Sequence, residues 1–156
     1  MNIFLTIISG VAVFVLGQIF LKLVIDPIQE AKKTIARIRI ELIRNGHVLH
    51  NANAVDKELK DKLFESFRSL AAELIAATEI IPFYKATSKV AGLPSNKKMR
   101  DASRNLIALS NWMFVNHDKQ IGHILKNNDE LADNLGFKID PGDRVSKEAI
   151  AELIKY

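Results

Sequence analysis

The opening of the chain is its most apolar stretch. Ile3 to Leu21 contains no charged side chain, and at about 1.5 Å of rise per residue it forms about 28 Å of helix, which matches the hydrocarbon core of a bilayer. A cleaved signal peptide has a basic start and a shorter apolar region, whereas only Met1 and Asn2 precede this run. The pattern therefore predicts an uncleaved transmembrane anchor over residues 1–25.

After the anchor, apolar residues recur at helical spacing. Asp26-Pro27-Ile28-Gln29 has the form of a helix start, with Asp26 as N-cap, Pro27 at the first helical position and Gln29 closing a capping box. We expect this helix to end near Asn51 to Asn53. Its predicted core stripe is Ile28, Ala31, Ile35, Ile38, Leu42 and Leu49.

Two further long helices follow from the same pattern. One is expected from about Asp56 to just before Pro82, and after a connector over residues 82–94, with a short helical turn through Tyr84 to Val90, another from about Asn96 to Asn116. The stripe of the first is Leu59, Leu63, Phe67, Leu70, Leu74 and Ile81. The stripe of the second is Met99, Ala102, Leu106, Leu109 and Met113, and it is widened by Ile107, Trp112, Phe114 and Val115. This width predicts that the end of the helix is buried nearly all round.

The C-terminal part is also helical in its pattern. Asp118 is expected to cap a helix that stops at Gly136, and Ser146 to cap a short terminal helix after a turn at residues 140–143. Their apolar residues are Ile121, Leu125, Leu131 and Leu135, then Ile150, Leu153 and Ile154. The predicted fold class is all-α: one N-terminal transmembrane helix followed by a cytoplasmic helical bundle. The predicted regions are the anchor over 1–25, the helical cytoplasmic domain over 26–136 and the C-terminal turn and short helix over 137–156.

Charge sets the predicted orientation. The net charge is +4, and the whole basic excess lies after Leu21, beginning with Lys22, Lys32, Lys33, Arg37 and Arg39. The positive-inside rule then places the C-terminal domain in the cytoplasm and the N-terminus outside. Because topology accounts for much of a modest excess, a nucleic-acid partner is not expected. The absence of cysteine excludes disulfides, thiolate catalysis and cysteine-ligated zinc.

The span also carries a stripe of small residues. Thr6, Gly10, Val13 and Gly17 alternate at steps of three and four, so a second helix can approach closely along them. This predicts a homo-oligomer, although glycine is also simply common in membrane helices. The Gln18 amide either bridges protomers, faces a polar lumen or reaches the interfacial water near Lys22.

Two weak catalytic or metal candidates lie in the segment from Arg44 to His50. Arg44-Asn45-Gly46-His47-Val48-Leu49-His50 fits the loose arginine-to-histidine pattern of HEPN ribonucleases. On a regular helix Arg44 and His50 lie about 240° apart around the axis, so they converge only if Gly46 breaks the helix. A polar helix end is the competing interpretation. His47 and His50 lack further ligands at suitable spacing, so no metal site is expected.

A polar set in the predicted third helix, with two possible neighbours, forms the ligand hypothesis. The set is Arg68, Tyr84, Arg100, Arg104, Asn105, Ser110 and Asn111. Arginine with asparagine and tyrosine suits a phosphate or nucleotide, because guanidinium binds phosphate bidentately and an aromatic face stacks a base. The alternative is that these groups satisfy one another inside the bundle.

Three short segments resemble an uncharacterised family of short bacterial single-pass membrane-anchored helical proteins. They are Asp26-Pro27-Ile28-Gln29, Ile81-Pro82-Phe83-Tyr84, and the run from Ala102 to Asn111 that reads ASRNLIALSN. The resemblance covers about the first 115 residues and implies a bacterial source and a location in the inner membrane. It implies no activity.

Three functions follow as hypotheses. The first is a non-enzymatic membrane protein that self-associates as a scaffold, sensor or pore-forming effector. The second is a nucleotide-gated membrane effector of antiviral defence, and the third is a membrane-tethered HEPN-like ribonuclease. The sequence lacks a phosphate loop, a dinucleotide fingerprint, a nucleophile elbow and a zinc-helix motif, so no cofactor is expected.

Overall fold

The regular structure of the protein is helical wherever it is described. The computed structural model describes residues 2–51, 54–115, 119–137 and 145–155. Within these ranges a long apolar N-terminal helix leads into a helical bundle, and no strand occurs. This confirms the predicted all-α class.

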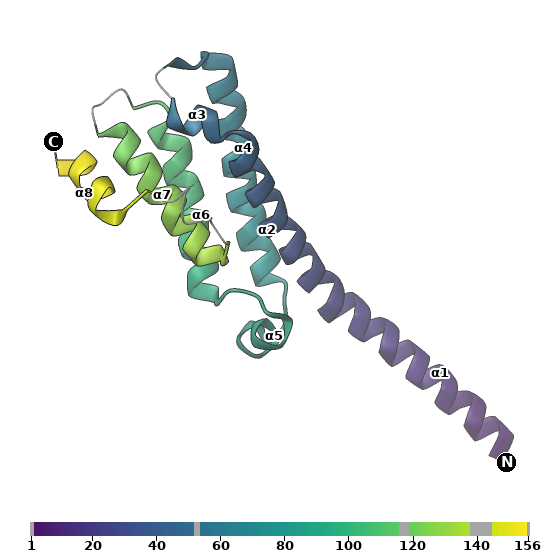
Figure 1. Cartoon of the computed structure of the whole chain (residues 1–156). Helices are drawn as coiled ribbons and strands as arrows, with labels where there is room; N and C mark the ends of the chain where they lie inside the picture. The colour runs from purple at the N-terminus through teal and green to yellow at the C-terminus, as the bar shows by residue number, and fades with distance from the viewer. Residues whose placement is uncertain (1, 52–53, 116–118, 138–144, 156) are drawn as a thin grey trace.

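The apolar N-terminal helix and the first helix of the bundle are continuous. Helix α1 (Asn2–Phe20) passes through a π-helical turn, η1 (Leu21–Ile25), directly into α2 (Asp26–Arg44), and Figure 1 shows them as one long rod that leaves the bundle at one end. The prediction that Asp26 caps a new helix is therefore wrong. Asp26 has helical dihedral angles (φ −60°, ψ −47°) and its N–H donates to the Leu21 carbonyl, whereas an N-cap residue is non-helical.

Proline explains why the turn is wide at this point. Pro27 has no N–H to donate, and its ring clashes with the carbonyl four residues earlier in a regular α-helix. A π turn directly before Pro27 absorbs this mismatch without ending the helix. The capping signature in the sequence thus marks a local change of helix geometry.

Six helices follow α2 in the described ranges. They are α3 (Gly46–His50), α4 (Lys57–Glu79), α5 (Tyr84–Ala91), α6 (Asn96–Trp112), α7 (Gln120–Leu135) and α8 (Lys147–Lys155). Helix α4 packs between α2 and α6, α6 packs on α7, and α8 packs on the outer side of α7. Helix α3 contacts α7 and so closes the end of the bundle far from α1.

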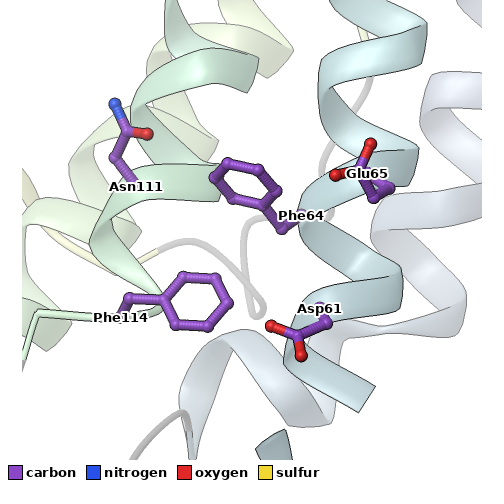
Figure 2. A pocket seen from close by; sticks show the side chains of 5 residues that line it. All are labelled: Asp61, Phe64, Glu65, Asn111 and Phe114. Atoms are coloured by element: carbon purple, nitrogen blue, oxygen red, sulfur yellow. The ribbon is translucent and has the colours of Figure 1, made fainter. Parts of the chain in front are cut away.

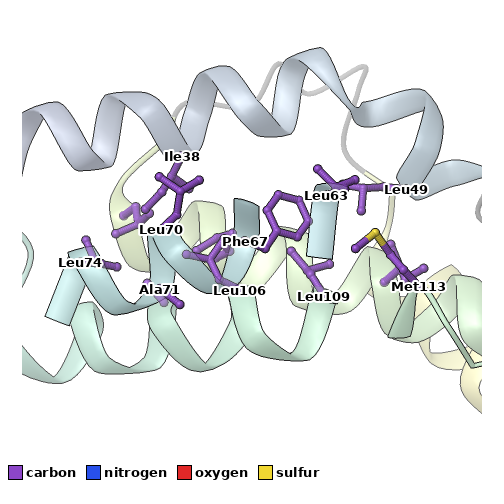
Figure 3. Packing of buried hydrophobic residues seen from close by; sticks show 14 of the residues in the cluster. Ile38, Leu49, Leu63, Phe67, Leu70, Ala71, Leu74, Leu106, Leu109 and Met113 are labelled. Carbon is purple, nitrogen blue, oxygen red and sulfur yellow. The ribbon is translucent and has the colours of Figure 1, made fainter. Parts of the chain in front are cut away.

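The core forms where the apolar stripes of these helices meet. Figure 3 shows Phe67 and Leu74 of α4 among Ile38 of α2 and Leu106 and Leu109 of α6. All five side chains are fully buried, as are Met99, Ala102 and Met113. The predicted core stripes of α4 and α6 are confirmed at these positions.

A few predicted core positions are exposed instead. Leu59, Ile121 and Leu153 lie near helix ends and are 37%, 38% and 45% exposed. In α7 the fully buried aliphatic side chains are Ile124 and Leu131. The prediction that the end of α6 is buried nearly all round is also wrong. Ile107, Phe114 and Val115 are all at least one-third exposed, although α4 and α7 both pack on α6.

The predicted single helix after the anchor is divided at Asn45. Helix α2 ends at Arg44, and Asn45 (φ −107°, ψ 16°) leads into α3. The Asn45 side chain is buried and its Nδ2 donates to both the carbonyl and Oε1 of Glu41, each at 3.0 Å. This local bonding competes with helix continuation, and the bend delivers Val48 and Leu49 to the core.

Caps and turns of the C-terminal part agree with the sequence where they are described. Gly136 (φ 73°) ends α7, and Ser146 Oγ accepts a hydrogen bond from the Ala149 N–H. The predicted cap at Asp118, the turn at residues 140–143, and the predicted helix ends at 52–53 and 116 lie outside the described residues.

Candidate functional site

Helix α1 is exposed along its whole described length. Every side chain from Ile3 to Phe20 is exposed, and Ile3, Val13 and Phe14 are 79%, 71% and 66% accessible. Among the described residues, the helix Ile3–Arg44 alone is long and apolar enough to cross a membrane, and none of its most apolar window is buried in the protein. An apolar surface of this size is far larger than water-soluble proteins leave open.

The small-residue stripe of α1 is open to a neighbouring helix. Apart from the adjacent residues and the backbone of α1 itself, no atom lies within 4 Å of the position that a Cβ would take at Gly10 or Gly17, and Thr6 and Val13 are exposed. Within the described part of the chain, no hydrogen-bond partner is present for the Gln18 amide. The residues predicted to form an oligomer face are therefore accessible and unused by the bundle.

Arg44 and His50 lie on the two sides of the helix break. Arg44 is exposed, and its Nη1 lies 3.9 Å from Glu41 Oε2. The break at Asn45 meets the condition under which this pair can converge, but the side chain of His50 lies outside the described residues, so the ribonuclease motif stays a prediction. No group of three or more metal-ligating side chains occurs in the part of the chain that the structure describes.

The residues of the ligand hypothesis do not meet in one site. Arg68 and Asn111 meet between α4 and α6, where Arg68 Nη2 donates to Asn111 Oδ1 at 3.0 Å. Arg104 and Asn105 face α7, and Tyr84 lies beside Pro94 near the anchored end of the bundle. Arg100 is exposed, and Ser110 is fully buried with its hydroxyl donating to the Ile107 carbonyl at 2.7 Å.

A pocket of about 480 Å³ lies between α4 and the end of α6 and is shown in Figure 2. Phe64 and Phe114 form its apolar wall, with ring centroids 5.6 Å apart in an edge-to-face contact. The Arg68 guanidinium lies over the Phe64 ring at 4.7 Å, while Asp61 and Glu65 also line the pocket. Two carboxylates oppose an anion here, so the pocket does not favour a phosphate ligand.

A second hollow, of about 530 Å³, is lined by Arg104 and Asn105 among other residues. Arg104 Nη1 lies 3.1 Å from Asp101 Oδ1, and Asn105 Nδ2 donates to Glu130 Oε2 at 3.0 Å. Asp133 adds another carboxylate to the lining. As in the first pocket, internal bonds occupy the polar groups and acidic side chains surround them.

Tyr84 is held within the fold. Its hydroxyl donates to the Pro94 carbonyl at 2.8 Å. Burial raises the pKa of Tyr84 above its usual value, and a side-chain hydrogen bond with Thr78 partly opposes this change. The tyrosine thus links the start of α5 to the segment that leads into α6.

One exposed apolar set was missed by the sequence analysis, which treated its segment as a connector. Phe83, which directly precedes α5, and Val90 within α5 are 88% and 93% exposed. The available signal was the presence of two large apolar residues seven positions apart among lysines.

A scan against family models and searches of curated proteins and of solved structures found no match to this chain.

Proposed function

We propose that this chain is a single-pass protein of the bacterial inner membrane that self-associates through α1 and holds its helical bundle at the cytoplasmic face. The observation that carries the proposal is the exposure of α1, which buries none of its most apolar window in the bundle. Such a helix gains free energy only in lipid or against other helices. The basic residues that follow Leu21 support the orientation with the N-terminus outside.

Self-association is supported by the accessible small-residue stripe. Membrane helices associate mainly by close packing and by hydrogen bonds between helices, and small residues permit that approach. Gly10 and Gly17 leave this space open. In hydrocarbon, the adjacent Gln18 amide would be stabilised by a hydrogen bond to a second copy of the helix. The role that fits is a non-enzymatic scaffold, sensor or pore-forming effector.

The second and third hypotheses stay predictions. The nucleotide hypothesis is not favoured by the positions of its residues, which do not meet in one site, and the two pockets that some of them line also contain carboxylates. The ribonuclease hypothesis depends on a side chain outside the described residues. No observation supports either of these hypotheses as the exposure of α1 supports the first.

The test is the number of chains per particle in mild detergent, measured by size-exclusion chromatography with light scattering. We expect the natural chain to form an oligomer and Gly10→Leu with Gly17→Leu to yield a monomer, because the larger side chains separate the helices. Ala12→Leu is the matched control: at 100° per residue it lies on another side of α1, so it should keep the oligomer. A monomeric natural chain would contradict the proposal.

A further inference from the structure

We propose that α5 is a second membrane contact, in which its exposed apolar side chains enter the cytoplasmic lipid surface and its lysines meet anionic headgroups. This inference rests on the proposed anchoring by α1 and deepens it. The occupant of the exposed face of α5 is therefore the headgroup region of the same bilayer that α1 crosses.

The two faces of α5 differ in the way expected of an interfacial helix. Ser88 is buried against the bundle, whereas Ala86 and Val90, four positions apart, are exposed on one face. Lys85 and Lys89 lie beside them, one position earlier in each case, and are also exposed. An apolar strip edged by lysines is the pattern of helices that lie in the plane of a membrane interface.

Phe83 adds an observation that packing within the chain does not explain. Its φ of +49° is the one positive φ of a non-glycine residue among those described, and a bulky side chain adopts this conformation only rarely. The conformation directs the chain into α5 while leaving the phenyl ring 88% exposed. The Ala86 and Thr87 N–H groups donate to the Phe83 carbonyl and hold this turn, but the bundle does not bury the phenyl ring, whereas contact with lipid would.

The position of α5 matches the level at which the anchor leaves the bilayer. Ile81, Leu93 and Ala77 form a small core with Ala31 of α2, and Ile28 and Tyr84 pack against it. Ile28 follows the π turn by three residues, so this core lies just beyond the apolar span. Figure 1 shows α5 at the end of the bundle from which α1 departs, opposite the end closed by α3.

Charge identifies the partner as an anionic lipid surface. Residues 80–100 contain five of the 22 basic side chains and none of the 18 acidic ones. They comprise α5 and the start of α6, which begins at the same end of the bundle. The cytoplasmic leaflet has a negative surface potential that attracts such a cluster within a Debye length.

The experiment uses the full-length chain, which contains no natural cysteine, so one introduced cysteine takes one environment-sensitive fluorophore. Ala86→Cys reports on α5, Leu16→Cys on the span, and Glu58→Cys on the far end of the bundle. Each labelled protein is reconstituted in vesicles of equal parts phosphatidylcholine and phosphatidylglycerol with a nitroxide lipid as quencher. Both leaflets have the same composition, so the orientation of insertion does not affect the reading.

We expect the labels at residues 16 and 86 to be quenched severalfold more strongly than the label at residue 58. Adding Lys85→Glu with Lys89→Glu should remove most of the quenching at residue 86 and leave that at residue 16 unchanged. Phe83→Ser with Val90→Ser should act in the same direction. The matched control is Lys57→Glu with Lys60→Glu, which changes charge equally at the far end and should have no effect at residue 86.

Each remaining outcome contradicts the proposal in a distinct way. Quenching at residue 16 with residue 86 equal to residue 58 would overturn the lipid contact of α5 and leave the anchoring intact. A blue-shifted label at residue 86 that the nitroxide lipid does not quench would assign the face to a protein partner. An unquenched label at residue 16 would overturn the anchoring, and the α5 contact with it.

Discussion

Helices α1 and α4 are both long and rich in aliphatic residues, but they use them in opposite ways. Helix α4 has a fully buried stripe that includes Phe67 and Leu74, with polar residues on its other side. Helix α1 is apolar around its whole circumference, and each of its side chains from Ile3 onward is exposed. The fold of the bundle therefore depends on contacts within the chain, whereas the place of α1 depends on the medium around it.

The boundary between these two regimes lies within one continuous helix. The rod from Ile3 to Arg44 changes from uniformly apolar to amphipathic at η1. Its first charged residues are Lys22, within η1, and Asp26, at the start of α2. Equal substitutions on the two sides of η1 should thus affect different properties, and this makes the comparison testable.

The largest effect is expected from charges in the middle of α1. Val11→Asp with Phe14→Asp should release the protein from membranes, because two carboxylates near the centre of a span cost about 5 to 7 kcal/mol of insertion free energy. The measurement is sedimentation of lysed cells after an alkaline wash. The bundle should stay helical, since α1 makes no core contact.

The matched control for this pair lies on the same rod. Ile40 and Ile43 have the same spacing and are 54% and 73% exposed in α2, so Ile40→Asp with Ile43→Asp should leave the protein in the membrane fraction. Release by both pairs, or by neither, would remove the distinction between the two parts of the rod.

A smaller effect, on folding stability and not on membrane association, is expected from a substitution in the core. Phe67 is fully buried, so Phe67→Ala should lower the free energy of unfolding by about 3 to 5 kcal/mol without changing membrane association. Denaturant unfolding in detergent, followed by Trp112 fluorescence, measures this. Leu59→Ala is the control in the same helix, and its cost should be well under that of Phe67→Ala because Leu59 is 37% exposed. Equal losses of unfolding free energy in the two variants would show that the buried stripe of α4 does not stabilise the core.

The smallest effect is expected where a glycine permits close packing inside the bundle. A Cβ on Gly122 would lie 2.9 Å from Ile154 Cγ1 and 3.0 Å from Leu153 Cβ. Gly122→Ala should therefore weaken the docking of α8 on α7 by about 1 to 3 kcal/mol, measured as faster hydrogen exchange of the α8 amides. Gly46→Ala, with open space around it, should not alter that exchange. Unchanged exchange in Gly122→Ala would contradict the packing.

Much of the fold could be predicted from the sequence, because the apolar residues of α4 and α6 follow a regular helical period. The misses occur where local bonding competes with that period. The Asn45 side chain donates a hydrogen bond back to Glu41, and the helix bends there. The sequence predicts a helix start at Pro27, but a π turn accommodates this proline within a continuous helix. Neither outcome can be read from spacing alone, because both depend on which backbone groups find partners.

The candidate site residues show the same division. Arginine, asparagine and serine in α6 indicated either a pocket or mutual satisfaction, and only the neighbours from α4 and α7 distinguish these interpretations. Arg68 reaches Asn111, and Asn105 reaches Glu130. Asp61 and Glu65 lie on the same helix as Arg68, and Asp101 lies on the same helix as Arg104, so these carboxylates could be expected from the sequence. Only Glu130 and Asp133, which α7 brings beside Arg104, depend on the tertiary structure.

The amino-acid sequence by itself determined that this chain is helical, that its first helix is long and apolar enough for a bilayer, and which stripes meet in the core. These features follow from composition and period, which are properties of a single segment. The tertiary structure alone decided that α1 and α2 form one rod, that the polar residues of α6 are spread among separate neighbours, and that Phe83 and Val90 stay exposed. The physical reason is that burial and charge environment depend on which segments pack together, and distant parts of the chain contribute those neighbours.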